Sequence, residues 1–145
     1  MQTITQAAAT LGNPNGDRYY TQAELDAQYA ADIERKKLAR LTAREQITAG
    51  ASPFRVYRDK IVAYHGTALR LQAVGLNLYN SGVWARRKGV HLDNLIANAD
   101  AEHVEILIDL LRSYAKRGEN DADFLALGRE LAEANAPRPR KGARA

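Results

Sequence analysis

The chain has 145 residues, of which 46% are hydrophobic and 26% charged, with a net charge of +4 and no cysteine; this suits one globular domain and excludes disulfides, thiolate metal sites and thiol nucleophiles. No apolar run approaches the roughly 20 residues of a membrane span, and the N-terminus lacks the basic and apolar regions of a signal peptide. We therefore expect a cytoplasmic protein that does not enter a membrane.

The N-terminal part predicts a lead-in followed by a long helix. Residues 1–20 hold a short Ala-rich helical segment that ends in the turn signal Gly12-Asn-Pro-Asn-Gly16. Thr21 and Glu24 have the spacing of a capping box, in which each side chain accepts a hydrogen bond from the other residue's backbone amide. They predict the start of a helix over about residues 22–48.

This long helix changes character along its length. Leu25, Tyr29 and Ile33 lie four residues apart on one face, and the same face continues with basic residues. The helix therefore either leaves the core halfway or breaks near residue 35. In the second case the apolar face is rotated and consists of Leu38 and Leu41.

The central part predicts the main core helix. Ser52 before Pro53 is a favourable helix start. One apolar row follows at steps of three and four residues, comprising Tyr57, Ile61, Tyr64, Ala68, Leu71, Gly75 and Leu78. A second row lies beside it, comprising Val62, Leu69, Ala73, Leu76 and Tyr79. Two adjoining rows make a wide apolar face, which is typical of a central helix. Gly66 is a candidate division into two helices, Gly75 would allow another helix to approach closely, and Asn80–Gly82 ends the pattern.

The C-terminal part predicts two amphipathic helices after a possible short one at residues 92–98. Asp100 caps the first, which runs to about Lys116 and stops at Gly118. Its inward residues are predicted to be Val104, Leu107, Ile108, Leu111 and Tyr114. Asn120 or Asp121 opens the last helix, which Pro137 closes. Its inward residues are predicted to be Phe124, Leu127, Gly128 and Leu131.

These elements predict an all-α fold, a compact bundle of about five to six helices around a long central helix. Strand-like alternation is absent beyond a few residues. We expect one helical domain over residues 1–135, of which 1–20 are the lead-in. Residues 136–145 are rich in Pro and Arg and predict a disordered, flexible basic tail.

The sequence contains no recognisable catalytic or metal-binding pattern. His65, His91 and His103 are not spaced as paired ligands, and capping or packing roles are expected for them. The glycines do not cluster as phosphate-binding or dinucleotide-binding loops require. We therefore expect a non-enzymatic protein without metal or cofactor. An enzyme whose site is assembled from dispersed carboxylates stays open as an alternative.

Charge is distributed unevenly along the chain. Residues 35–92 carry twelve basic and two acidic side chains, whereas residues 93–133 carry four basic and ten acidic ones. The basic middle indicates either an acidic partner or pairing with the protein's own acidic helices. The candidate partner-binding residues are Lys36, Lys37, Arg40, Arg44, Arg55, Arg58, Trp84, Arg86, Arg87 and Lys88. Trp84 beside three cations suits phosphate contact with base stacking, or else it is a core residue.

A helix-turn-helix is a second interpretation of this region. Residues 41–49, the Gly50 turn and residues 53–64 have the gross shape of that motif. Glu45 and Gln46, however, stand where the motif requires an apolar and a small residue, and Pro53 opens the second helix where polar base-reading residues are expected.

Three sequence segments resemble a known family. They are Gly66-Thr-Ala-Leu-Arg70, Leu76-Asn-Leu-Tyr-Asn80 and Val90-His-Leu-Asp-Asn-Leu-Ile96. Over about residues 62–117 the chain resembles a small helical domain family of unknown function from proteobacterial plasmids, integrative elements and phages. The chain departs from that family in a longer insertion around residues 86–88. The resemblance implies a mobile-element origin and assigns no activity.

Together these features predict a helical binding protein, an accessory protein of a phage or plasmid. We expect it to inhibit a host defence complex, or another partner with an acidic or nucleic-acid-associated surface, by occluding that surface. Direct binding of DNA or RNA through the basic middle is the alternative. The oligomeric state is left open.

Overall fold

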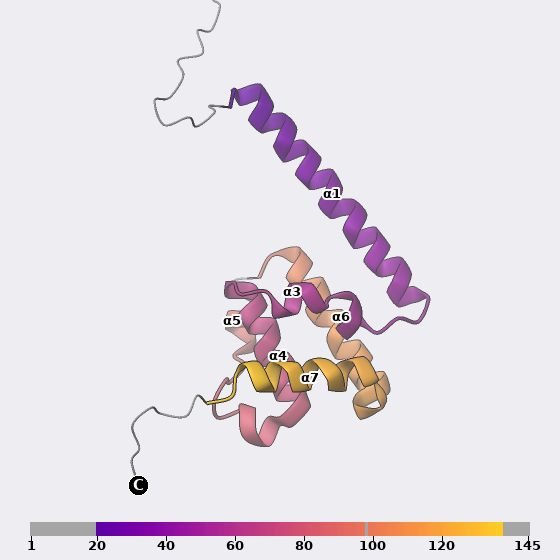
Figure 1. The fold of residues 1–145 in the computed structure, drawn as a ribbon, viewed down its shortest axis with the longest axis vertical. Helices are drawn as coiled ribbons and strands as arrows, with labels where there is room; N and C mark the ends of the chain where they lie inside the picture. The colour runs from indigo at the N-terminus through magenta and orange to yellow at the C-terminus, as the bar shows by residue number, and fades with distance from the viewer. Residues whose placement is uncertain (1–19, 98, 138–145) are drawn as a thin grey trace, which may run out of the picture. The chain divides into compact units, whose positions relative to one another are not determined.

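The computed structural model describes residues 20–97 and 99–137, and none of these residues lies in a strand (Figure 1). The all-α fold predicted from the sequence is confirmed. The α-helices are α1 (Gln22–Thr48), α2 (Pro53–Val56), α3 (Arg58–Val62), α4 (Gly66–Trp84), α5 (Leu92–Ala97), α6 (Ala101–Arg117) and α7 (Ala122–Ala134). A 3-10 turn, Gly118–Asn120, lies between the last two. The predicted lead-in, up to residue 19, and the tail from residue 138 lie outside the described residues.

The chain divides into two units, residues 1–41 and residues 42–145. The first helix described in the N-terminal unit is α1. Here the predicted capping box is confirmed, because the Thr21 amide donates to Glu24 Oε2 at 2.8 Å and the Glu24 amide donates to Thr21 Oγ1 at 3.2 Å. None of the described helices is both long and apolar enough to cross a membrane.

Helix α1 differs from both alternatives suggested by its sequence. It runs without a break through residue 35, and none of its residues is fully buried. Leu25, Tyr29 and Ile33, which the pattern places on a helix face suited to a core, are exposed. Only the last turns of α1, which belong to the second unit, reach the core, where Ala43 and Ile47 pack against it.

The second unit has one hydrophobic core around α4. This helix packs against α3, α6 and α7, as expected for the predicted central helix. The buried core consists of Phe54, Tyr57, Ile61, Leu71, Val74, Leu76, Trp84, Leu95, Ile106, Leu107, Leu110, Phe124, Leu127 and Leu131.

The region predicted as one or two helices over residues 53–80 contains three. Tyr57, with φ −99° and ψ 9°, separates α2 from α3, and residues 63–65 separate α3 from α4. Gly66 is the first residue of α4, so the division predicted there is confirmed. Tyr64 was predicted in the core but is 92% exposed, because it lies in the break and not on a helical face. The absence of one helix over residues 53–64 also contradicts the helix-turn-helix interpretation.

Helices α4 and α7 pack closely through two glycines. A Cβ atom on Gly75 would lie 3.3 Å from Leu131 Cδ1, and one on Gly128 would lie 2.2 Å from Tyr79 Cδ2. The close approach predicted at Gly75 is confirmed, and the tighter contact is at Gly128. The ring of Phe124 lies beside these residues, 6.2 Å from the Tyr79 ring between centroids.

Helix α4 changes direction near its end, where the sequence predicts its stop. Asn80 has the non-helical angles φ −156° and ψ 82°, and its Oδ1 accepts a hydrogen bond from the Val83 amide at 3.2 Å. Asn80 therefore acts as a cap for a final turn, which carries Trp84 into the core.

Helix α6 buries a face that only partly matches the predicted one, since Leu107 is buried and Tyr114 packs against the core as predicted. Ile106 and Leu110 are buried together with Leu107, whereas Ile108 and Leu111 are 40% and 41% exposed. Apolar residues cover more than half of the circumference of α6, so periodicity alone did not identify the face that packs. Asp100 caps α6 as predicted, accepting from the His103 amide at 2.9 Å. In α7 all four predicted inward residues are buried.

Candidate partner-binding surfaces

The basic residues of α2 and α3 pair with acidic residues of the same unit. Arg58 contacts both carboxylate oxygens of Glu130 on α7, with Nε donating to Oε2 at 3.0 Å. This pair raises the pKa of the Arg58 guanidinium. Arg55 Nε lies 4.0 Å from Asp123 Oδ2, also on α7. For this part of the basic middle, the alternative of internal pairing holds.

Lys60 follows the same pattern. Its ammonium group forms an ion pair with Glu102 at the start of α6. The basic surface formed by α2 and α3 therefore faces acidic helices that follow it in the chain, and its charge available to a partner is reduced.

The cations of α1 pair along their own helix. Lys36 Nζ lies 2.7 Å from Asp32 Oδ2, and Arg35 contacts the same carboxylate. The hydrogen bond from Lys36 is the largest cause of the lowered pKa of Asp32. Lys37 Nζ lies 4.0 Å from Glu34 Oε1. Such pairs between exposed side chains one turn apart are weak, so these cations stay accessible to a partner. Arg40 and Arg44, further along the helix, are exposed as well.

The segment from Trp84 to Lys88 separates into buried and exposed parts. Trp84 is 5% exposed, which contradicts its predicted role as a surface stacking platform and supports the alternative of a core residue. Arg87 covers its ring, with Cζ 5.8 Å from the ring centroid. Lys88 makes two hydrogen bonds within the second unit. Its ammonium group donates to the Asn135 side chain, and its carbonyl oxygen accepts from Asn77 Nδ2 at 2.7 Å. Arg86 and Arg87 are exposed, and neither forms an ion pair with a carboxylate of the described residues.

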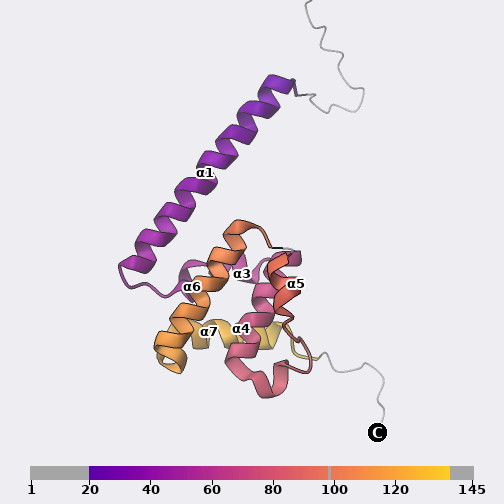
Figure 2. The ribbon, with the colours of Figure 1, turned by 180° about the vertical axis from the view of Figure 1, so that it is seen from behind.

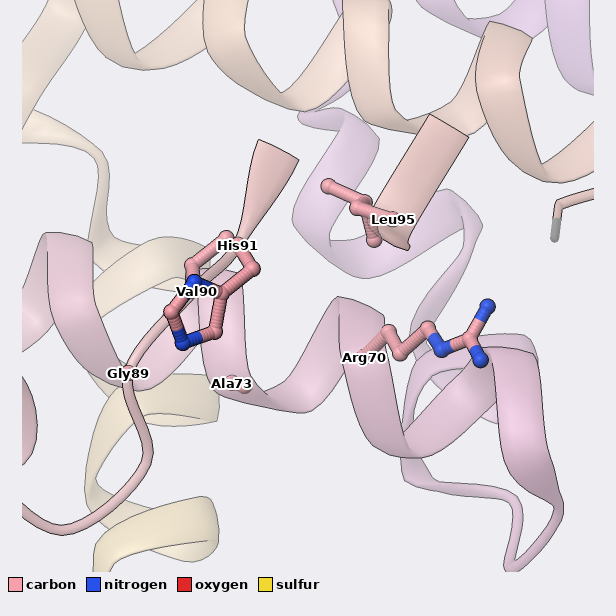
Figure 3. A pocket seen from close by; sticks show the side chains of 6 residues that line it. All are labelled: Arg70, Ala73, Gly89, Val90, His91 and Leu95. Atoms are coloured by element: carbon pink, nitrogen blue, oxygen red, sulfur yellow. The ribbon is translucent and has the colours of Figure 1, made fainter. Parts of the chain in front are cut away.

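A small pocket lies between α4 and the segment before α5 (Figure 3). Its volume is about 90 Å³, well below the roughly 300–1,000 Å³ of sites for drug-sized ligands. It is lined by Arg70, Ala73, Gly89, Val90, His91 and Leu95. Figure 3 shows the guanidinium of Arg70 directed away from His91, so the two basic groups do not converge on one point in the pocket.

The other two histidines lie at helix starts. His65 Nδ1 accepts from the Ala68 amide at 3.5 Å, and His103 Nδ1 lies 2.7 Å from Asp100 Oδ1. The two rings are edge to face, 5.7 Å apart between centroids. Burial raises the pKa of Asp100, but the hydrogen bonds from His103 outweigh it and the net pKa is lowered. These contacts match the capping and packing roles expected from the sequence. The described residues contain no group of three or more His, Asp or Glu side chains arranged to hold a metal ion.

Half of the exposed large apolar side chains among the described residues, six of twelve, lie on α1 or just before it. The apolar residues of α1 were expected to pack into a core, so the predicted partner-binding residues comprised only cations and Trp84. These side chains are Tyr20, which precedes α1, and Leu25, Tyr29, Ile33, Leu38 and Leu41 on the helix. At 3.6 residues per turn, the last two lie about 150° around the helix axis from the preceding three.

The comparisons with known proteins assign no family. No family model matches the chain, and no curated protein or solved structure matches it. The resemblance of residues 62–117 to a helical family of mobile elements therefore stays a prediction from the sequence.

Proposed function

We propose that this protein is a non-enzymatic binding protein that engages its partner through α1. The observation that carries the proposal is the exposure of the apolar side chains of this helix. Soluble proteins rarely expose a run of large apolar side chains along one element unless it binds another surface. Tyr29, which is 71% exposed, is the kind of aromatic residue that dominates the energy of interfaces.

The arrangement of these side chains indicates how a partner would hold the helix. Leu25, Tyr29 and Ile33 share one side, while Leu38 and Leu41 lie largely on the opposite side. A flat surface would contact only one of the two sets. A partner that encloses the helix, or two surfaces that clasp it, would bury both.

The charge of α1 indicates the chemistry of that partner. The second half of the helix, residues 35–48, carries five basic side chains and one acidic one. An acidic surface around the second apolar set would complement this charge and increase the rate of association. A host defence complex, occluded at an acidic or nucleic-acid-associated surface, fits the mobile-element origin that the resemblance implies.

The experiment compares two tagged variants of the full chain in capture from a host lysate. Tyr29→Ala with Leu38→Ala removes one apolar residue from each side of α1, and both side chains are exposed, so the helix should still fold. Tyr64→Ala is the matched control, because Tyr64 is a more exposed aromatic in the second unit. We expect a stoichiometric complex with the natural chain and the control, and its loss with the α1 variant. The captured protein is then purified and the complex reconstituted to measure Kd. Retention of the complex by the α1 variant would contradict the proposal.

Direct nucleic-acid binding is the second candidate, favoured by the exposure of Arg86 and Arg87 together with Arg40 and Arg44 on α1. Binding through phosphate contacts weakens steeply with salt. Replacing Arg86 and Arg87 by Ala should reduce the slope of log K against log salt by about two, roughly one for each lost phosphate contact. Arg58→Ala is the control, because Glu130 already pairs with that cation. Absence of DNA and RNA binding at low salt excludes this candidate.

A further inference from the structure

Helix α6 carries a second apolar row that the core does not use. We call it the outer seam of α6; its members are Ala101, Val104, Ile108, Leu111 and Ala115. Val104 is half-buried, and the other four residues are exposed. The core buries other positions around the helix, namely Ile106, Leu107 and Leu110. Figure 2 shows α6 on the side of the second unit nearest the viewer, with no other helix of that unit in front of it.

The spacing of the outer seam is that of a coiled-coil contact. Its residues follow one another at steps of three, four, three and four, which is the alternation that keeps one narrow stripe facing a partner helix. Ile108 and Leu111 at its centre have the branched side chains that pack in such contacts. An exposed face needed only for solubility would carry polar residues at these positions.

We infer that the outer seam binds the outer seam of a second copy of this chain, with the two α6 helices antiparallel. In this arrangement Ile108 of each copy packs against Leu111 of the other, and Val104 packs against Ala115. The contact is isologous, as in most homodimers, because the same surface serves both copies.

Charge complementarity supports the second copy and its direction. Glu105 and Arg112 are seven residues apart and flank the outer seam on the same side. In an antiparallel pair Glu105 of one copy lies beside Arg112 of the other, and this contact occurs twice. In a parallel pair this flank of each helix would instead face the opposite flank of the other, so Glu105 and Arg112 would not meet. The other flank contains Leu107 and Tyr114, which pack in or against the protein's own core.

Helix α1 is a less suitable dimer contact, because its apolar residues do not form one stripe.

The outer seam is short: 15 residues of helix span about 22 Å. That length cannot bury the 2,000 Å² or more that is usual for obligate dimers. The dimer is therefore reversible and forms as the protein concentration rises. Dimerisation through the outer seam is independent of the proposed role of α1, since it uses a different helix.

Sedimentation velocity of the full chain over a concentration series tests the inference. The weight-average mass should rise from one chain toward two as concentration increases. Ile108→Ser with Leu111→Ser should weaken dimerisation by about tenfold or more, and because both residues are exposed the fold should survive, as a thermal melt can verify. Ile96→Ser is the matched control, since Ile96 is an exposed isoleucine outside the outer seam, and it should leave the dimer unchanged.

A charge exchange tests the direction of the pair. Arg112→Glu should weaken the dimer, and adding Glu105→Arg in the same chain should restore it. In a parallel pair position 112 of one copy would not lie beside position 105 of the other, so adding Glu105→Arg would restore nothing. A single-chain mass at every concentration overturns the inference. Dimerisation that survives Ile108→Ser with Leu111→Ser overturns it equally.

Discussion

The hydroxyl of Ser52 donates a 2.7 Å hydrogen bond to Oδ2 of Asp121, and both side chains are buried. Ser52 is the N-cap of α2 and Asp121 is the N-cap of α7, so the bond joins two helix starts that are distant in sequence. The other oxygen of Asp121 accepts from the amides of Asp123 and Phe124 at 3.0 and 3.2 Å.

Replacing Asp121 by Ala should therefore lower the free energy of unfolding by about 2–4 kcal/mol, since it removes a helix cap and leaves the Ser52 hydroxyl buried without its acceptor. Urea unfolding measures the change. Asp121→Asn retains the capping oxygen and should lose less. An equal loss for both variants would show that the cap and the buried contact are not what stabilises this junction.

The two glycines at the contact of α4 with α7 should respond differently to a methyl group. Gly128→Ala places Cβ against the base of the Tyr79 ring, and overpacking of this kind costs about 1–3 kcal/mol or more. That cost exceeds the roughly 1 kcal/mol gained from the better helix propensity of Ala. Gly75→Ala meets only the end of the Leu131 side chain, so its effect should stay within about 1 kcal/mol. Thermal unfolding should rank Gly128→Ala clearly below Gly75→Ala; the reverse order would contradict the packing described here.

Tyr57 links stability to pH at the alkaline end. Burial, followed by the 3.0 Å hydrogen bond that its hydroxyl donates to Asp109, raises the pKa of Tyr57 to about 12. Because the folded pKa lies above the unfolded value of about 10, the neutral phenol contributes stability that is complete below pH 10 and is lost as pH rises toward 12. Ultraviolet titration should show a tyrosine ionisation near pH 12, and Tyr57→Phe should remove that step.

Ser113 is a site for a stabilising substitution. Its hydroxyl is buried in α6 and has no hydrogen-bond partner among the described residues. Ser113→Ala removes an unsatisfied polar group and improves helix propensity, so it should raise the free energy of unfolding by up to about 1 kcal/mol. A lower melting temperature for this variant would indicate that the hydroxyl is satisfied in solution.

Local signals in the sequence identified where helices start and which face α7 buries. The caps at Thr21, Ser52, Asp100 and Asp121 depend on neighbouring residues, so they can be recognised without tertiary information. The face of α7 was predicted correctly because it has one apolar stripe. Helix α6 has two, and only the packing of other helices determines which one is buried.

The candidate site was less predictable, because it depends on which charged side chains form pairs in the folded protein. Arg58 pairs with Glu130, 72 residues later, and Lys60 with Glu102, 42 residues later. Neither pair has a local sequence signal. The exposure of Leu25, Tyr29 and Ile33 was missed for a related reason, since an apolar stripe has the same pattern whether it packs in the chain's own core or on a partner.

The lack of buried side chains along α1 also affects the susceptibility of the chain to proteolysis. Opening a helical segment costs least where few apolar contacts are lost, so limited digestion of the free protein should cut within residues 22–41 before it cuts within α4, α6 or α7. Trypsin has basic residues to recognise there, at Arg35, Lys36, Lys37 and Arg40. Protection of these bonds in a mixture would map the footprint of whatever binds α1, without any change to the chain.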